Sequence, residues 1–251
     1  MLLLEDIRWR GGAFELSVPR WEVVAGEFHA LAGCNGAGKS SLLKVIAGEA
    51  IGEGRVVLHG HELKRWPALT RARHLGVLPQ NSSLNFPFSA GEVVALGATP
   101  LALNWRERQR LVRRQMRLTQ CEHLAQRDYP RLSGGEKQRV HLARVLVQLS
   151  QADNSPLLLL DEPTSAQDLG QQQVVLELAS NLARHRNFAV VAVLHDVNHS
   201  LRHATRVSLV AAGRVVDSGS PGDVLTAAAI HRHWGVAVAE FHSAEGERLL
   251  A

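Results

Sequence analysis

The chain has 251 residues, of which 45% are apolar and 21% are charged, and it carries a formal net charge of +4 at pH 7. Such a composition is ordinary for a soluble globular protein, and the length is enough for a substantial buried core. No stretch approaches the ~18 consecutive apolar residues that a membrane span requires, and the mild charge does not by itself indicate nucleic-acid binding.

The beginning of the chain reads MLLLED, which is too short and too acidic for a secretory signal. Only Cys34 and Cys121 are present, so no disulfide framework is indicated. We therefore expect the chain in the cytoplasm, with any membrane association made through a partner protein.

The N-terminal third contains a glycine-rich loop with phosphate-binding spacing, GCNGAGKSS. Short apolar runs bounded by turns predict strands at Phe14–Val18, Glu27–Leu31, Arg55–Leu58 and Leu75–Leu78, and a helix at Ser40–Ala47. The loop therefore joins a strand to a helix, the context that a nucleotide site requires. Lys39 is predicted to contact the β- and γ-phosphates, and the Ser40 hydroxyl to bind Mg²⁺. The predicted nucleotide-binding residues of this loop are Gly33, Cys34, Asn35, Gly36, Ala37, Gly38, Lys39, Ser40 and Ser41.

The middle of the chain changes to helical periods. From about Ser82 to Leu149 there are many arginines and no convincing strand, which indicates a helical insertion between two halves of a core. Within it, Trp105–Arg117 holds six arginines and one glutamate. The simplest interpretation is a solvated helical face; proximity to anionic lipid headgroups and, more weakly, nucleic-acid binding stay open.

The last hundred residues return to strands. They are predicted at Leu157–Leu160, Ala189–Leu194, Val207–Ala211 and Arg214–Val216, with a helix over Gly170–Arg184. Strands interleaved with helices predict an α/β core with a mainly parallel sheet.

Two carboxylates follow the first of these strands. Four consecutive leucines read as a fully buried strand that delivers Asp161 and Glu162 to its exposed carboxyl end. Adjacent residues point in different directions there. Asp161 is predicted to hold Mg²⁺, and Glu162 to orient and polarise an attacking water as general base.

Three histidines, His195, His199 and His203, have i, i+4 spacing and suggest a metal-binding face. Because the chain has 13 histidines and no further ligand set at suitable spacing except Asp196, coincidence is the better explanation. We predict no metal site there.

A third motif lies between the other two. Leu132, Ser133, Gly134, Gly135 and Glu136 resemble the signature of ABC (ATP-binding cassette) ATPases. The resemblance implies the ABC ATPase fold: an α/β P-loop NTPase core with a mainly parallel sheet, an antiparallel β part and an inserted α-helical subdomain. It implies one domain over 1–251, in which 1–81 and 150–251 form the catalytic core and 82–149 the helical subdomain that carries the signature.

The same resemblance implies further site residues. Gln80 matches the Q-loop glutamine, which reaches Mg²⁺ and the attacking water, and His195 matches the switch histidine that contacts the γ-phosphate. Trp9 stands where an aromatic ring stacks on adenine. A core role for this tryptophan is nearly as well supported, and Phe14 is the weaker alternative for stacking.

In ABC proteins the signature acts in trans, on ATP held by the phosphate loop of the other subunit. One chain with one loop and one signature therefore implies a head-to-tail homodimer around two ATP molecules with Mg²⁺. Ser165 and Asp168 occupy the D-loop place as subunit contacts, and Gln167 departs from the usual leucine.

Among ABC proteins the chain resembles most closely the ATP-binding subunits of bacterial haem importers. The resemblance rests on Leu78–Leu84 with Phe86–Phe88, Glu92–Gly97, Leu194–Asn198 and Gly213–Val216 with Gly219–Pro221. It implies an ATPase of the translocase class (EC 7.6.2), at the cytoplasmic face of the inner membrane. Its partners would be two permease copies, a second copy of itself and, indirectly, a periplasmic haem-binding protein, with no nucleic acid. Ferric siderophore or vitamin B12 is the alternative cargo.

Two other function classes are less consistent with the sequence. Soluble ABC ATPases that act on DNA or ribosomes typically carry two cassettes, a long coiled coil or a zinc insertion. A small-molecule kinase would leave Leu132–Glu136 without a role.

Overall fold

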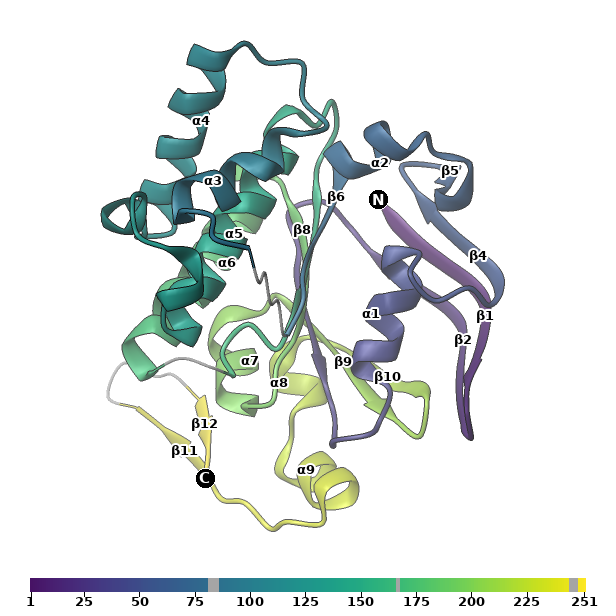
Figure 1. Cartoon of the computed structure of the whole chain (residues 1–251). Helices are drawn as coiled ribbons and strands as arrows, with labels where there is room; N and C mark the ends of the chain where they lie inside the picture. The colour runs from purple at the N-terminus through teal and green to yellow at the C-terminus, as the bar shows by residue number, and fades with distance from the viewer. Residues whose placement is uncertain (81–85, 166–167, 244–247) are drawn as a thin grey trace.

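The computed structural model describes residues 1–80, 86–165, 168–243 and 248–251 (Figure 1). Its strands are β1 (Leu2–Gly11), β2 (Phe14–Val23), β3 (Phe28–Ala32), β4 (Glu53–Leu58), β5 (His61–Glu62), β6 (Leu75–Leu78), β7 (Leu157–Asp161), β8 (Ala189–Val193), β9 (Arg206–Ala211), β10 (Arg214–Gly219), β11 (Glu240–His242) and β12 (Arg248–Leu250). Its α-helices are α1 (Lys39–Ala47), α2 (Ala68–His74), α3 (Ala90–Ala95), α4 (Trp105–Leu118), α5 (Gly134–Gln148), α6 (Leu169–Arg186), α7 (Val197–His203), α8 (Pro221–Val224) and α9 (Ala227–Trp234). Short 3₁₀ turns lie at Leu63–Arg65, Leu96–Ala98, Glu122–Leu124, Tyr129–Arg131 and Leu149–Gln151.

Two sheets form the core. The larger has the strand order β10-β9-β3-β8-β7-β6, and all its neighbours are parallel except the β9–β10 pair. The smaller is antiparallel, with the order β2-β1-β4-β5. The predicted α/β fold, with a mainly parallel sheet and an antiparallel β part, is confirmed.

The central strands of the larger sheet are buried on both faces, which explains their nearly continuous apolar sequences. Every residue of β3 and β8 is buried, as are the four leucines of β7. Helix α1 fills the space between the two sheets (Figure 1), with Leu42 and Ile46 in that core. On the opposite face the sheet packs against α5 and α6.

Helices α3, α4 and α5 build a separate apolar core from side chains such as Val93, Met116 and Val140. Helix α5 belongs to both cores: Leu142, Val145 and Leu146 pack against the large sheet, whereas Val140, Ala143 and Val147 face α3 and α4. The helical part therefore packs on the sheet mainly through one face of α5, with an additional contact from Leu118 at the end of α4. The expected boundary between 81 and 82 lies outside the described residues.

Several element bounds differ from the sequence predictions. Strand β2 continues to Val23, five residues beyond the predicted end, because its pairing with β1 runs as far as Leu2↔Val23. The predicted strands did not include β1, whose apolar alternation shifts by one residue at an irregularity between Glu5 and Arg8 and whose register comes from β2 and β4. The C-terminal helices and the β11–β12 hairpin were likewise not predicted. Among the described helices, none combines the length and apolar character needed to traverse a bilayer.

Candidate nucleotide-binding and hydrolysis site

The glycine-rich loop lies at the carboxyl end of β3 and leads into α1. Gly33 has φ +146°, and a Cβ there would come within 2.1 Å of the Val210 carbonyl oxygen. Gly38, the residue before α1, has φ +106°, and a Cβ there would lie 2.6 Å from the Phe14 ring. Glycine is therefore required at both positions by conformation and by contact. The backbone N–H groups at the start of α1 are available to an anion.

The Lys39 ammonium group folds over this loop. Its Nζ donates to the carbonyl oxygens of Gly33 at 2.6 Å and Cys34 at 2.8 Å. Burial lowers the pKa of Lys39, while the nearby Glu162 acts in the opposite direction. A largely desolvated cation beside open N–H groups is suited to a phosphate chain.

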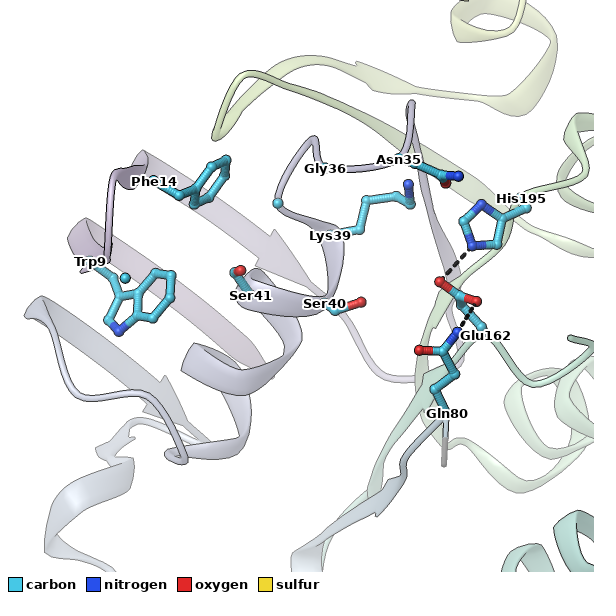
Figure 2. A pocket seen from close by; sticks show the side chains of 12 residues that line it. Trp9, Phe14, Asn35, Gly36, Lys39, Ser40, Ser41, Gln80, Glu162 and His195 are labelled. Atoms are coloured by element: carbon cyan, nitrogen blue, oxygen red, sulfur yellow. Dashed lines mark hydrogen bonds and ion pairs between the residues drawn. The ribbon is translucent and has the colours of Figure 1, made fainter. Parts of the chain in front are cut away.

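A cleft of about 630 Å³ opens above the loop. Figure 2 shows the side chains that surround it, with Lys39 and Ser40 on one side and Glu162 and His195 on the other. Its lining residues are Trp9, Gly11, Phe14, Asn35, Gly36, Gly38, Lys39, Ser40, Ser41, Gln80, Glu162 and His195. Most of the predicted nucleotide residues and all three predicted catalytic residues therefore face one space.

Ser40 and Asp161 are joined directly. The Ser40 hydroxyl donates to Asp161 Oδ1 at 2.8 Å, which links the first turn of α1 to the end of β7. Burial and the neighbouring Glu162 charge raise the pKa of Asp161, although the Ser40 hydrogen bond opposes this. Oxygen donors that include a partly desolvated carboxylate are the ligands that Mg²⁺ prefers, so these residues fit that ion.

Glu162 lies between Gln80 and His195 (Figure 2). Gln80 Nε2 donates to Glu162 Oε2 at 2.5 Å, and His195 Nε2 lies 2.6 Å from Glu162 Oε1. The three residues follow β6, β7 and β8, which are adjacent parallel strands, so their side chains meet at the carboxyl end of the sheet. Glu162 has φ +50°, a left-handed conformation that residues other than glycine rarely adopt.

Two aromatic side chains form the outer wall of the cleft. Trp9 and Phe14 both line it, and they belong to β1 and β2 of the antiparallel sheet (Figure 2). The Trp9 ring lies over Gly11, where a Cβ would come within 2.2 Å of the indole. Sequence reasoning missed Gly11. Its signal was its place two residues after Trp9, on the same face of a strand.

Three predicted loop residues, Gly33, Cys34 and Ala37, do not line the cleft. Ala37 is buried. The Cys34 thiol points toward the C-terminal helix α9, where Sγ donates to the His233 carbonyl oxygen at 2.9 Å. Cys34 therefore connects the loop to the end of α9.

The signature residues also lie outside this cleft. Leu132 is inserted in the helical core, while Ser133 and Gly134 are exposed at the start of α5. Ser133 caps that helix: its Oγ accepts from the Glu136 N–H at 3.3 Å, and its own N–H donates to Glu136 Oε2 at 2.8 Å. This backbone hydrogen bond holds the pKa of Glu136 below its usual range. The remaining signature residue, Gly135, lies in the first turn.

The predicted D-loop is described only at its ends. The Ser165 hydroxyl donates to the Glu162 carbonyl oxygen at 3.0 Å. Asp168 caps α6 by accepting from the Gln171 N–H at 2.9 Å. Gln167, the departure from the usual leucine, lies outside the described residues.

The histidines after β8 separate in their contacts. His195 reaches Glu162, whereas His199 Nε2 lies 3.1 Å from Gln172 Oε1 on α6. In the described ranges no cluster of three or more His, Cys, Asp or Glu side chains has the arrangement of a metal site.

Comparison with known proteins gives consistent matches. A family model described as ABC transporter matches residues 16–165. The hemin import ATP-binding protein HmuV of Vibrio cholerae is 51% identical over 210 residues, which cover 84% of this chain and 81% of that protein. A chain of an inward-facing ABC transporter described as metal-chelate type superposes with a TM-score of 0.83 at 25% identity, covering 100% of this chain and 97% of that one. The dimeric, post-hydrolysis ADP- and Pi-bound structure of an ATP-binding cassette has a TM-score of 0.75 at 25% identity, covering 88% of this chain and 99% of its own.

Proposed function

We propose that this chain is the ATP-hydrolysing subunit of a bacterial haem importer. The chain belongs to the ABC transporter family, and its haem-import relatives support this role. The arrangement around Glu162 carries the chemical part of this proposal. One carboxylate is held at 2.5 Å by the Gln80 amide and at 2.6 Å by the His195 imidazole, beside a phosphate-binding loop and in the same cleft. Hydrolysis of a bound nucleotide is the chemistry that such a set performs.

The proposed mechanism assigns each group a task. Lys39 and the loop N–H groups hold the β- and γ-phosphates, and the aromatic wall of Trp9 receives adenine. Glu162 accepts a proton from the attacking water, while His195 and Gln80 keep its carboxylate in position.

Mg²⁺ would be held by Ser40, Asp161 and Gln80. Bound there, the ion supplies positive charge that stabilises the phosphate oxygens. The direct Ser40–Asp161 hydrogen bond supports this assignment, because it already brings two of these oxygen-bearing side chains together.

A second copy of the chain completes the site in this proposal. Ser133 and Gly134 are exposed and lie outside the cleft of their own chain, so they are available to a nucleotide on another subunit. At the start of α6, next to Asp168, Leu169 is 82% exposed, as expected of a side chain that a partner covers. We therefore assign Leu132–Glu136 to action in trans, and Ser165 and Asp168 to the contact between head-to-tail subunits.

The remaining partners are a pair of membrane permeases at the cytoplasmic face of the inner membrane. We assign residues 82–149 to a helical subdomain that receives them, and the separate apolar core of α3, α4 and α5 supports this division. Phe86, just before α3, is 65% exposed and offers an apolar contact. A periplasmic haem-binding protein would deliver cargo on the other side, without contacting this chain.

The cargo assignment rests on the haem-import relatives, and uptake measurements test it. The experiment is ATP-dependent haem uptake into vesicles that contain this subunit and its co-purified permease, with Glu162→Gln as the control. We expect haem uptake that the substitution abolishes. ATPase activity without haem uptake would contradict the cargo and favour a ferric siderophore or vitamin B12.

A further inference from the structure

A second cleft lies at the end of the large sheet opposite the nucleotide site. It has a volume of about 720 Å³ and is bounded by α4, α5, the end of α6 and the segment before β7. Pro156 and Phe188, which line it, immediately precede β7 and β8, whereas Glu162 and His195 follow those strands. The second cleft therefore lies at the amino ends of β7 and β8, and the nucleotide cleft lies at their carboxyl ends.

One wall of this second cleft is apolar, whereas other lining residues, among them Gln115, Asp153 and Asn154, are polar. Its walls include Leu103, Leu111 and Leu118 from the α4 region, and Leu146 and Leu149 from α5 and the turn that follows it. Phe188 closes the side toward the sheet. Leu146 and Leu149 are already buried, whereas Leu103, Leu111, Leu118 and Phe188 are partly exposed. An apolar chain or ring placed here would remove the partly exposed side chains from water, which favours binding.

A strongly basic hollow adjoins this second cleft. It has a volume of about 480 Å³ and is lined by Leu118 and five arginines: Arg110, Arg113, Arg114, Arg117 and Arg186. Arg114, Leu118 and Arg186 line both spaces, so the hollow and the cleft are continuous. Four of the arginines come from α4 and one from the end of α6.

The positive charge of this hollow is mostly uncompensated. Arg117 pairs with Glu122 at 2.7 Å. This hydrogen bond, together with the Arg117 and Arg113 charges, lowers the pKa of Glu122. For the other four arginines, no side-chain carboxylate of residues 1–80, 86–165, 168–243 or 248–251 comes within 4 Å. Their mutual repulsion would be relieved by an anion, and guanidinium groups bind phosphate and carboxylate well.

We propose that the arginine hollow and the apolar wall of the cleft together bind an amphipathic anion, with its phosphate or carboxylate head at Arg114 and Arg186 and its apolar part between α4 and Phe188. The concave shape and the adjoining apolar space favour a single molecule over a flat membrane surface. Because Arg114 belongs to the helical part and Arg186 to the sheet-bound α6, the ligand bridges the two parts of the chain.

Calorimetric titration with decyl phosphate tests this proposal. Saturating Mg-ADP fills the phosphate loop, so that the probe reports only the second site. Decanol and inorganic phosphate serve as separate probes of the apolar part and of the head. The test variant is Arg114→Gln with Arg186→Gln, and the matched control is Arg106→Gln with Arg108→Gln, which removes two exposed α4 arginines that line neither space.

We expect one decyl phosphate per chain, bound at least tenfold more weakly by the Arg114/Arg186 variant and within twofold of the parent by the control. Inorganic phosphate and decanol should each bind far more weakly than decyl phosphate. Equal weakening in both double variants, or phosphate binding as tightly as decyl phosphate, would overturn the site. Binding to phosphatidylglycerol vesicles without saturable decyl phosphate binding would also overturn it, in favour of a membrane surface.

Discussion

Glu162 Oε1 lies 2.6 Å from His195 Nε2, although the two residues belong to loops that follow different strands. The carboxylate keeps this contact while Gln80 holds its other oxygen. The position of Glu162 is therefore determined from two sides, by the ends of the neighbouring strands β6 and β8.

The first prediction concerns the charge of this carboxylate. Glu162→Gln preserves the size of the side chain but replaces one acceptor oxygen by an NH2 group and removes the base, so we expect kcat to fall at least about 100-fold with ATP affinity little changed. Gel filtration with Mg-ATP should show a stable dimer of the variant. Glu177→Gln, which changes an exposed glutamate of α6, is the matched control and should behave like the parent. A variant that stays monomeric with Mg-ATP contradicts the proposed ATP sandwich.

Ser133→Arg tests the trans action of the signature. We expect unchanged nucleotide binding, measured by titration, and loss of ATPase activity, because the bulky cation replaces the hydroxyl that we propose faces the partner subunit. Removing a helix cap costs about 1 kcal/mol by itself. Ser89→Arg removes an equivalent capping box from α3 and is the control that should remain active.

Mixing two inactive variants sharpens that test. If the signature acts in trans, a mixed dimer of one Ser133→Arg chain and one Lys39→Ala chain has one intact site. That site pairs the phosphate loop of the Ser133→Arg chain with the signature of the Lys39→Ala chain. Partial recovery of ATPase activity on mixing is therefore expected. If both motifs acted within one chain, every site would keep one defect and no activity would return.

Cys34 should be the reactive thiol. Cys121 is completely buried, and burial raises the pKa of its thiol, so it is protected from alkylation. Iodoacetamide should modify Cys34, separate the loop from the His233 carbonyl group and abolish ATP binding. Peptide mass spectrometry locates the adduct, and Cys34→Ala, which should bind ATP and resist inactivation, is the control. Full ATP affinity after modification of Cys34 would disprove this link.

Trp9→Ala tests adenine stacking. Loss of one base–aromatic contact costs about 1–3 kcal/mol, so the Kd for ATP should rise by a factor of roughly 5 to 150. Trp105→Ala is the control, since that ring is 66% exposed at the start of α4. A fluorescent-nucleotide titration measures both. An effect confined to Phe14→Ala would transfer the stacking role to that ring.

Stability should depend on pH through two histidines. Burial, with the nearby Arg144 charge, lowers the pKa of His141 to about 4, and burial with the charges of His199 and Arg202 lowers that of His203 to about 4. Unfolded histidines titrate near 6.5, so between these values the unfolded chain binds more protons. The contribution of both histidines to the free energy of unfolding is complete above pH 6.5 and is lost as the pH falls toward 4.

Calorimetric melting between pH 7.5 and 4.5 measures this loss. The Tm of His141→Gln should fall less steeply as the pH is lowered. The reason is that unfolding of this variant no longer exposes the His141 imidazole to protonation. His61→Gln, at an exposed position, should leave the slope unchanged. Identical slopes in the parent and the His141 variant would contradict the assignment.

Motifs whose chemistry demands particular residues could be predicted from the sequence. Four leucines before Asp161 require burial on both faces, and Gly33 and Gly38 provide backbone conformations that other residues rarely adopt. The strands and the helix beside these motifs could be predicted from the apolar runs that flank them in the sequence. The α/β fold and the convergence of Lys39, Glu162 and His195 on one cleft therefore agree with the sequence reading.

Other features depend on contacts that no local pattern contains. The direction of the Cys34 side chain is set by α9, about two hundred residues later in the chain. Strand β1 takes its register from β2 and β4, and the basic hollow requires Arg186 of α6 to meet α4. Spacing within one segment carries no information about such pairings between distant segments.

The strand order of the large sheet also sets when the protein becomes functional during its synthesis. Strand β3, which carries the phosphate loop, has only β8 and β9 as hydrogen-bonded neighbours, and 156 residues separate Ala32 from Ala189. At roughly 5–20 residues per second, a ribosome needs on the order of ten to thirty seconds to add them. A nascent chain therefore carries a complete phosphate-loop sequence long before β8 and β9 are available to pair with the strand that holds that loop.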